Sequence, residues 1–378
     1  MNQVIVFGND HTNSLGVIQS LGLAGYKSIG LLFGDKTGYV KASKYTERII
    51  SGSNPQICID ELLKQSFETD SKIPIIACCD DAALTLDKNS DRLKNHFVFE
   101  YASNYTFDFL FQKENQVKIA TEVGFYVPKS WNLHGVEQIP DDVIFPCIIK
   151  PLVSCQGAKG DIHICYTKEE LEKKLGKLKY TKQVLLQQYI DKDYEISILG
   201  CRLSDGSCLL PVVEKKLSLY PKNVGLSCFA EMQKLTDKGI IDCITNLVNV
   251  IGYVGLFSVE MMHCKIDGRF YFTEINLRND GAESFVTKYG ANLPLNHLED
   301  LMGLPLTKQI EEKPGCYIHD MHHLRSLLCG DISIFTWIKE IRKSKGFLMY
   351  YKEDKKPFFR QYIYMLKKML KRKKTLKY

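Results

Sequence analysis

The chain has 378 residues, of which 45% are apolar and 25% charged, an ordinary balance for a globular protein with two or three domains. Its net charge of +6 comes from the last 21 residues, which hold eight basic and no acidic side chains, so the charge says little about the substrate of the body. The start lacks a basic region before a long apolar run, and no apolar run reaches the length of a membrane span, so we predict a cytoplasmic protein. The thirteen cysteines are scattered without a CxxC pair, which is typical of reduced, buried thiols.

The first predicted unit is a parallel α/β lobe. An apolar run, Val4 to Phe7, precedes the polar segment GNDHTNSLG, the helically spaced VIQSLGLAGY and the apolar SIGLLFG. The polar segment does not match GxGxxG, and a ribose-binding acid would have to be Asp35, so a dinucleotide site is not expected. A further strand, IPIIACC, runs into Asp80-Asp81, which either touch a substrate at the strand's carboxyl end or begin the next helix.

The second unit begins near Phe107 with a predicted helix that carries Lys113 and ends at Gly124. The strand FPCIIKPL then ends in Lys150 and leads into the small-residue loop VSCQGAKG. A lysine at a strand end followed by a flexible backbone suits phosphate binding. A simple strand-end charge with a hairpin is the alternative interpretation.

The middle of the chain alternates helix and strand. KEELEKKL is a predicted solvated helix, and VLLQQYIDKDYEISIL is a predicted pair of strands around a polar corner. SCLLPVVEKKLSLY continues this lobe, where Lys215 or Lys216 either reaches a substrate or occupies a solvated strand position. A helix is predicted near IIDCITNLVNVIGY.

Two apolar segments after Gly255, joined by a turn around Asp267-Gly268, each carry one carboxylate, Glu260 or Glu274, that a strand does not require. A three-residue loop of residues 266–268 would place Glu260 directly opposite Glu274, with Asn276 on the same face. A two-residue type I′ turn would instead put the two glutamates on opposite faces.

Two carboxylates about 5 Å apart repel by roughly 3 kcal/mol at an effective dielectric constant near 20, so a cation is expected between them. Mg²⁺ prefers carboxylate and amide oxygens and often bridges to nucleotide phosphates. A hairpin with a solvated polar face is the alternative, but it does not explain why Asn276 and Arg278 accompany both carboxylates.

After Arg278 the chain is mostly helical, through GAESFVTKYGANLPLNHLEDLMG. His319, His322 and His323 have helical spacing that could hold zinc, but a surface helix explains a motif this weak better. The final segment, 358–378, predicts a basic amphipathic helix. Such a helix lies on an anionic membrane, contacts a partner or docks on the body with its basic face solvated, and nucleic-acid binding is the weakest option.

Together these residues resemble the ATP-grasp superfamily, notably its carboxylate-amine ligases and the carbamoyl phosphate synthase large subunit, up to about residue 305. The resemblance implies a mixed α/β and α+β fold with a Rossmann-like pre-ATP-grasp lobe at 1–105. An ATP-grasp domain at 106–305 would follow, with a lid subdomain at about 106–195 and a metal-binding lobe at about 196–305. Residues 306–378 would form a C-terminal extension that carries the basic tail.

The resemblance also implies roles for individual residues. Lys113, eleven residues before Gly124 of GFYVP, and Lys150 of PCIIKP match the family's phosphate-contacting lysines. The Gly-rich lid over the triphosphate corresponds to residues 154–160, with Ser154, Gly157 and Gly160 as contacts. The hinge that contacts adenine and ribose corresponds to Gln187, Gln188, Tyr189, Ile190 and Glu195, where Gln replaces the family's first hinge acid.

EINLR matches the family signature EINxR, with Leu277 in place of the usual Pro. The metal ligands implied are Glu260, Glu274 and Asn276. Arg278 would hold the transferred phosphate or a substrate carboxylate bidentately, and Arg278 and Lys150 are the predicted catalytic residues.

The implied activity is that of an ATP-dependent ligase with ATP and Mg²⁺ (or Mn²⁺) as cofactors, which forms a C–N bond through an acylphosphate and releases ADP and phosphate. Its partners would be a small carboxylate and an amine, or a thiol in place of the amine, with no nucleic acid; a homodimer is one option. A small-molecule kinase of the same fold and a non-catalytic ATP-binding module are the alternatives. Neither the carboxylate nor the amine can be identified from the sequence.

Overall fold

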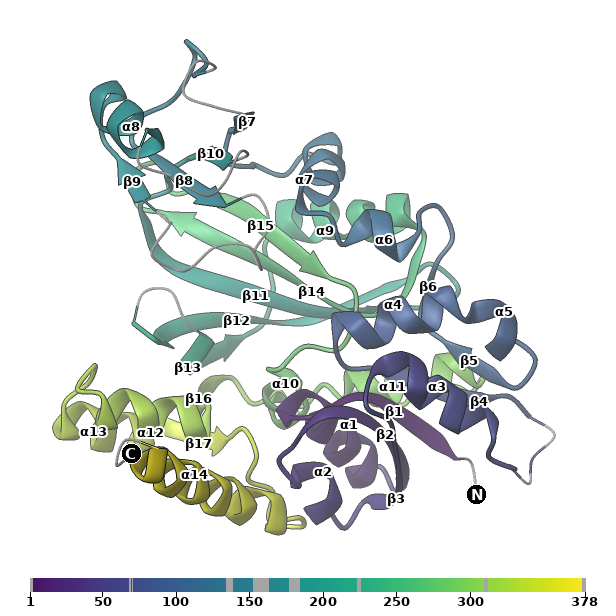
Figure 1. Ribbon diagram of the computed structural model, residues 1–378. Coiled ribbons are helices and arrows are strands. Elements are labelled where there is room, and N and C mark those ends of the chain that lie inside the picture. The colour runs from purple at the N-terminus through teal and green to yellow at the C-terminus, as the bar shows by residue number, and fades with distance from the viewer. Residues whose placement is uncertain are drawn as a thin grey trace.

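The computed structural model describes residues 3–67, 69, 71–133, 139–151, 163–176, 184–222, 226–308 and 312–375. For residues 35–36, 150–151 and 366–375 it describes the backbone alone. The described chain forms three sheets: an N-terminal parallel sheet, a small antiparallel sheet and a large, mostly antiparallel one between them (Figure 1).

The N-terminal lobe is a five-stranded parallel sheet in the order β3-β2-β1-β4-β5. Its strands are β1 (Val4–Asp10), β2 (Ser28–Lys36), β3 (Thr46–Ser51), β4 (Ile73–Ala77) and β5 (Phe97–Phe99). Its helices are α1 (Thr12–Leu23), α2 (Tyr39–Ala42), α3 (Pro55–Leu63), α4 (Asp80–Lys88) and α5 (Ser90–Leu93). The residues from Val4 to Phe7 are fully buried, because helices cover both faces of the sheet, and a strand of this kind is apolar throughout. The predicted Rossmann-like lobe is confirmed, although α1 begins inside the segment that we predicted as a loop.

A connection leads from this lobe to the small sheet. It contains β6 (Tyr101–Ala102), α6 (Phe107–Leu110) and α7 (Lys113–Glu122). The small sheet is antiparallel in the order β7-β10-β8-β9, with β7 (Ser130–Leu133), β8 (Cys147–Pro151), β9 (His163–Cys165) and β10 (Val184–Gln188). Helix α8 (Lys168–Leu175) packs on it through Leu171 and Leu175, which are buried, while its other residues are largely solvated, as predicted.

The large sheet follows the order β15-β14-β11-β12-β13-β16-β17, and β6 pairs with β14. Its strands are β11 (Lys192–Arg202), β12 (Cys208–Tyr220), β13 (Leu226–Gln233), β14 (Tyr253–Cys264), β15 (Phe270–Asn276), β16 (Gly315–Ile318) and β17 (Ser344–Phe347). The accompanying helices are α9 (Lys238–Ile251), α10 (Glu283–Tyr289) and α11 (Leu293–Leu301). Strand β11 precedes both β12 and β14 in the chain and lies between them in the sheet. This strand order positions the site described below.

Helix α9 shows how the sequence holds this sheet in place. Ile244, Leu247, Val248 and Ile251 recur at helical spacing and are all buried on its inner face. The side chain of Asp237 caps the helix by accepting from the amide of Ile240 at 3.0 Å. The helix ends at Gly252, whose φ of 67° lies in the left-handed region, and the chain then enters β14 directly.

The C-terminal region adds α12 (Asp320–Leu328), α13 (Ile334–Lys343) and α14 (Lys356–Thr375). Strands β16 and β17 extend the large sheet, so part of the predicted extension at 306–378 is built into it. The domain boundaries that we placed near residues 105, 195 and 305 remain predictions. Among the described helices, none combines the length and the apolar character that crossing a membrane requires.

The described cysteines are all free thiols, and most of them are buried, as predicted. Cys58, Cys78 and Cys201, for example, lie inside the core. Burial raises the pKa of the Cys58 thiol to about 11, so it stays protonated and unreactive at neutral pH.

Candidate active site

Glu260 on β14 lies directly opposite Glu274 on β15, as predicted. The predicted three-residue loop is wrong: Cys264 pairs with Arg269, which leaves a loop of four residues closed by Gly268 in the left-handed conformation. The register then shifts by one residue at Thr273, because Glu260 pairs with Glu274 and Met261 with Phe272. This β-bulge compensates for the longer loop and restores the alignment of the two glutamates.

The two glutamates belong to a row of side chains that crosses four strands. Glu260 pairs with Ser197 on β11, and Ser197 pairs on its other side with Glu214 on β12. Directly opposite residues in adjacent strands point to the same face of a sheet, so Glu274, Glu260, Ser197 and Glu214 share one face. Three carboxylates therefore line up on one face of the large sheet.

Lys216, two residues after Glu214 on β12, provides the positive charge beside this row. Its ammonium group lies 2.9 Å from Glu260 and 3.6 Å from Glu195, and its side chain is only 9% exposed. Burial lowers the pKa of Lys216, but the carboxylates of Glu260 and Glu214 outweigh this and raise it above its usual value. Of the two alternatives stated for this lysine, the solvated strand position is wrong. Its neighbour Lys215 lies over the ring of Tyr194 at 3.8 Å.

Sequence reasoning missed Glu214 as a candidate site residue. Its side chain is 2% exposed, and its Oε1 atom has no hydrogen-bond partner among the described residues. Burial raises the pKa of Glu214 to about 7, against the opposing effect of Lys216. The available signal was an acid two residues before a lysine in an apolar strand, VVEKK, which places both side chains on one face.

Lys113 reaches the other end of the row. It is the first residue of α7, and its ammonium group lies 2.8 Å from Glu274. The lysine side chain is 67% exposed, so this ion pair contributes little stability and can open for a ligand. The predicted phosphate-contacting lysine and one predicted metal ligand are thus brought together.

Asn276 and Arg278, the remaining residues of the signature, contact each other at the end of β15. The guanidinium group of Arg278 donates to the side-chain oxygen of Asn276 at 3.0 Å, and Asn276 donates to the hydroxyl of Ser258 at 3.3 Å. Arg278 also lies 3.4 Å from Asp280, and its side chain is only 14% exposed. The arginine is thus held at the edge of the carboxylate row.

The N-terminal lobe contacts this arginine through Asp80, whose Oδ1 atom accepts from Arg278 Nε at 3.0 Å. Asp80 and Asp81 form the first turn of α4, as predicted for a helix start. A helix start and a position at the site are therefore compatible for this pair, because Asp80 in the first turn of α4 also contacts Arg278.

The hinge residues connect the small sheet to the large one. Gln187 donates to the hydroxyl of Ser130 at 2.9 Å, and Gln188 accepts from the backbone amide of Lys129 at 3.3 Å. Tyr189 donates its backbone amide to the carbonyl of Pro146, and Ile190 is buried. Glu195 lies five residues after Ile190 and forms ion pairs with Lys192 and Lys216.

The second predicted lysine and the lid cannot be placed in the same detail. The backbone of Lys150 lies in β8 opposite Leu185, as predicted for a strand-end position, but its side chain lies outside the described part of the chain. Ser154, Gly157 and Gly160 also lie outside the described residues.

The donor set of the carboxylate row fits a hard divalent cation. Burial raises the pKa of Glu260, with Asp280 and Glu274 adding to the effect, so a cation beside it would be stabilising. Among the described residues, no group of three or more His, Cys, Asp or Glu side chains forms a closed metal cluster. Mg²⁺ usually takes several of its ligands from water and phosphates, so it does not need a site made entirely of protein side chains. Two glutamates and the Asn276 amide are a suitable set of protein ligands for it.

The histidines of HDMHHL are not on a surface helix, contrary to our expectation. His323 is 2% exposed and lies 2.6 Å from Glu340, while the rings of His319 and His322 stack at 3.9 Å. Burial lowers the pKa of His322 to about 4, so this ring is neutral at physiological pH.

These features define the class of protein. Residues 116–287 match the family model described as ATP-grasp domain. This range contains the carboxylate row, Lys216 and Arg278. The chain therefore contains an ATP-grasp domain, preceded by a Rossmann-like lobe.

The chain is also similar to individual proteins in sequence and in fold. The chain is 24% identical over 322 residues to D-aspartate ligase of Enterococcus faecium (strain Aus0004), covering 78% of this chain and 76% of the relative. It is 29% identical to formate-dependent phosphoribosylglycinamide formyltransferase of Bacillus subtilis (strain 168), covering 45% of each. Its fold is similar to that of N5-carboxyaminoimidazole synthetase from Staphylococcus aureus complexed with ADP, with a TM-score of 0.66, 13% identity, and coverage of 87% of this chain and 85% of that one.

Proposed function

We propose that this protein is an ATP-dependent ligase that joins a carboxylate to an amine through an acylphosphate. The observation that carries the proposal is the row Glu274, Glu260, Ser197 and Glu214, with Lys113 and Lys216 beside it and Arg278 at its edge. Phosphoryl transfer needs charge neutralisation and alignment more than a side-chain nucleophile, and this row supplies both.

ATP would provide the phosphoryl group, and a divalent cation would neutralise the charge of its phosphates. Glu260, Glu274 and Asn276 would hold the cation. Lys113, released from Glu274, would contact the phosphates, and the predicted role of Lys150 is the same. Gln187 to Ile190 and Glu195 would face the nucleoside, and the lid residues Ser154, Gly157 and Gly160 would cover the triphosphate.

In the first step, a carboxylate oxygen of the substrate attacks the γ-phosphorus, and the bond from that phosphorus to the β-phosphate oxygen breaks. In the second step, the amine nitrogen attacks the acyl carbon, inorganic phosphate leaves and the amine gives up a proton. Arg278 would hold the anionic substrate groups in place with its planar donors. Its contacts with Asn276 and Asp80 fix the guanidinium group for this role.

The names of the similar proteins support a ligase over the two alternatives. D-aspartate ligase and N5-carboxyaminoimidazole synthetase are both named as enzymes that make a product from smaller parts. A kinase of the same fold would use the same residues but pass the phosphoryl group to a hydroxyl, and a binding module would need neither carboxylate.

The test is a screen for ADP release over pairs of carboxylates and amines, with amino acids, D-aspartate among them, as the first set and mass spectrometry of the product. Glu274→Gln serves as the blank, and Glu172→Gln on the solvated helix α8 is the matched control. We expect ADP release that requires both substrates. The product should be heavier than the carboxylate by the mass of the amine less one water. ADP release that needs no amine and leaves a phosphorylated alcohol would show a kinase instead.

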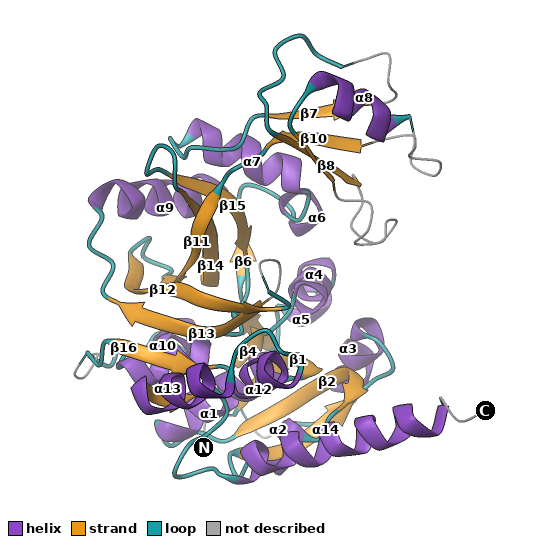
Figure 2. Cartoon of the chain, turned by 90° about the vertical axis from the view of Figure 1, so that its left-hand side faces the viewer, coloured by secondary structure: helices purple, strands orange, loops and turns teal. Residues whose placement is uncertain are grey.

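We further propose that the basic tail makes a peripheral contact with an anionic membrane. The first half of α14 docks on the N-terminal lobe, where Tyr364 meets Tyr39 edge to face at 6.0 Å and Gln361 is fully buried. Phe359 and Ile363 are 57% and 46% exposed. Figure 2 shows the backbone of α14 continuing past the lobe. Its last turns contain only basic charges in the sequence, which suits attraction to anionic lipids.

A further inference from the structure

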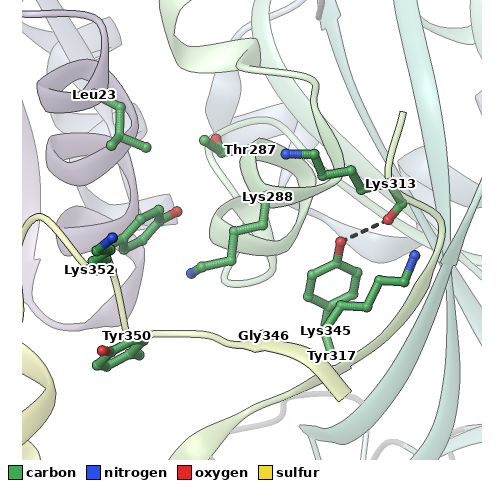
Figure 3. A pocket seen from close by; sticks show the side chains of 10 residues that line it. Leu23, Thr287, Lys288, Lys313, Tyr317, Lys345, Gly346, Tyr350 and Lys352 are labelled. Atoms are coloured by element: carbon green, nitrogen blue, oxygen red, sulfur yellow. Dashed lines mark hydrogen bonds between the residues drawn. The ribbon is translucent and has the colours of Figure 1, made fainter. Parts of the chain in front are cut away.

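A cavity of about 540 Å³ lies between α1, α10, β17 and the residues that follow β17 (Figure 3). None of its lining residues belongs to the carboxylate row or to the hinge. None of its lining residues is acidic, and four are lysines: Lys288, Lys313, Lys345 and Lys352. The cavity is therefore a separate site with a strong excess of positive charge.

The lysines of this cavity form no close ion pairs within the described part of the chain. None of the four forms an ion pair with a described residue, and the carboxylate shown to act on one of them, that of Asp320 on Lys288, does not line the cavity. Glu312, the neighbour of Lys313, pairs with Lys234 at 2.9 Å instead. Four ammonium groups around one cavity without a carboxylate repel one another, and an anion would relieve this repulsion.

Lys288 is the most constrained of the four. It is half-buried on α10, donates to the carbonyl of Leu348 at 2.8 Å and lies 3.5 Å above the ring of Tyr351. Burial lowers the pKa of Lys288, and the carboxylate of Asp320 offsets this only in part. An ammonium group held in this way gains more from a bound anion than a solvated one does.

The charged and titratable groups around Lys288 come from every neighbouring element. They are Glu283 on α10 itself, Asp320 on α12, Lys313 before β16 and Tyr317 on it, Lys345 on β17, and Tyr350, Tyr351, Lys352 and Glu353 after β17. Asp320 already accepts from the amide of Met349 at 2.9 Å, and Glu283 accepts from Thr287 at 3.1 Å. Neither carboxylate lines the cavity, and Asp320 offsets the effect of burial on Lys288 only in part.

The walls of the cavity add recognition beyond charge. Tyr350 is partly exposed and Leu23 on α1 is 42% exposed, and both line the cavity, whereas Tyr317 is a buried lining residue. The hydroxyl of Tyr317 donates to the carbonyl of Lys313 at 2.8 Å, which fixes one wall. The volume lies in the range of small-molecule sites and exceeds the size of a single inorganic phosphate.

We propose that this cavity binds a small phosphorylated anion, with a diphosphate group as the best match to the four lysines. Lysine is a point-charge phosphate binder, and a diphosphate carries about as much negative charge as these side chains can neutralise. The tyrosine and leucine walls would accommodate the organic part of such a ligand. This site is independent of the proposed ligase reaction.

The experiment is isothermal titration calorimetry of the full chain with pyrophosphate as the probe. A non-hydrolysable ATP analogue with Mg²⁺ is present at saturation, so that the carboxylate row and its lysines are already occupied. We expect one equivalent to bind, and Lys288→Met to weaken the binding at least tenfold. Lys173→Met, on the solvated helix α8, is the matched control and should bind like the natural protein.

The exposed pair Lys345→Ser and Lys352→Ser, combined in one variant, provides a second test that does not depend on a half-buried side chain. It should also weaken pyrophosphate at least tenfold. Absence of binding to the natural protein, or unchanged affinity in both cavity variants, would overturn the proposal. Orthophosphate distinguishes a single phosphate from a diphosphate, and succinate binding as tightly as pyrophosphate would overturn the assignment to phosphate.

The pH dependence of this binding gives a further check. A bound anion raises the pKa of Lys288, so binding takes up a proton and should weaken as the pH rises from 7 to 9. Lys288→Met should lose the part of this dependence that exceeds the titration of pyrophosphate itself. An equal pH dependence in the natural protein and in Lys288→Met would contradict the role of Lys288.

Discussion

The ammonium group of Lys216 lies 2.9 Å from Glu260 and 3.6 Å from Glu195, and Glu214 lies two residues before it on the same face of β12. One buried lysine thus faces three carboxylates from three adjacent strands. This charge balance keeps the carboxylate row stable without a ligand, and each of its members has a distinct expected effect on substitution.

Replacing Glu260 or Glu274 by Gln should abolish most of the activity while keeping the fold. Each substitution removes one anionic oxygen donor and preserves side-chain shape, so we expect ADP formation to fall about 100-fold or more. The measurement is the rate of ADP release at saturating Mg²⁺ and ATP. Full activity in either variant, with Glu172→Gln as the control, would contradict the proposed cation site.

Lys216→Met should destabilise the protein. It leaves Glu260 and Glu195 without their shared counter-charge, and because both carboxylates retain some solvent contact we expect a loss of about 2–4 kcal/mol, somewhat below that for a fully buried pair. The measurement is the free energy of unfolding in urea.

Lys215→Met is the matched control for that experiment. Lys215 is next to Lys216 in the sequence, but its side chain contacts the ring of Tyr194 instead of the carboxylates. We expect a loss of about 0.5–1 kcal/mol, as for an exposed cation–π contact. Equal losses in the two lysine variants would argue against the buried charge network.

The buried Glu214 should make stability depend on pH. Its pKa of about 7 in the folded protein is above the value near 4.3 of an unfolded glutamate, so the folded state binds the extra proton between these values. Stability should therefore decrease as the pH rises from about 4.5 to 7, by at most roughly 3.7 kcal/mol. Urea unfolding at pH 5, 6, 7 and 8 should show a smaller decrease in Glu214→Gln. Parallel curves for the two proteins would show that Glu214 titrates normally.

Asp80→Asn should weaken catalysis without unfolding the protein. Asp80 is 55% exposed, so loss of its ion pair with Arg278 should change stability by less than about 1 kcal/mol. The guanidinium group would lose one of the contacts that orient it, and we expect kcat/KM to fall about tenfold. Asp81→Asn, in the same turn of α4, is the control. A fall of equal size in both variants would point to helix capping rather than to Arg278.

Removing the end of the basic tail should abolish membrane contact. Truncation after Met365 keeps the docked residues Phe358, Gln361 and Tyr364 and removes seven of the eight basic residues of the tail. We expect the full chain to sediment with vesicles of anionic phosphatidylglycerol and the truncated chain to remain in solution. Binding of the full chain to neutral phosphatidylcholine to the same extent, or sedimentation of both chains, would exclude the electrostatic contact.

Much of this site could be predicted from the sequence, because its signals are local. Glu260 and Glu274 stand out as acids in apolar strands, and a short turn between them restricts their register. The loop length was wrong by one residue, yet the pairing held, because a bulge at Thr273 absorbed the difference. Burial of one face of the hairpin selects the alignment, and the bulge is the local adjustment that satisfies it.

Other parts of the site depend on contacts that no local pattern contains. Arg278 meets Asp80 across 198 positions in the sequence, and Glu214 joins the row only because β11 lies between β12 and β14. The burial of His323 on α12 differs from the predicted surface helix for the same reason, since its partner Glu340 lies 17 positions further along the chain.

The sequence by itself determined the kinds of side chain at the site and the strands that carry them, because apolar runs, turns and acids follow one another within short segments. The tertiary structure decided which charges face one another. Strand order brings Lys216 to Glu260, and the docking of the N-terminal lobe brings Asp80 to Arg278. The physical reason is that burial and Coulomb attraction depend on distances in space, and sheet order sets those distances independently of separation along the chain.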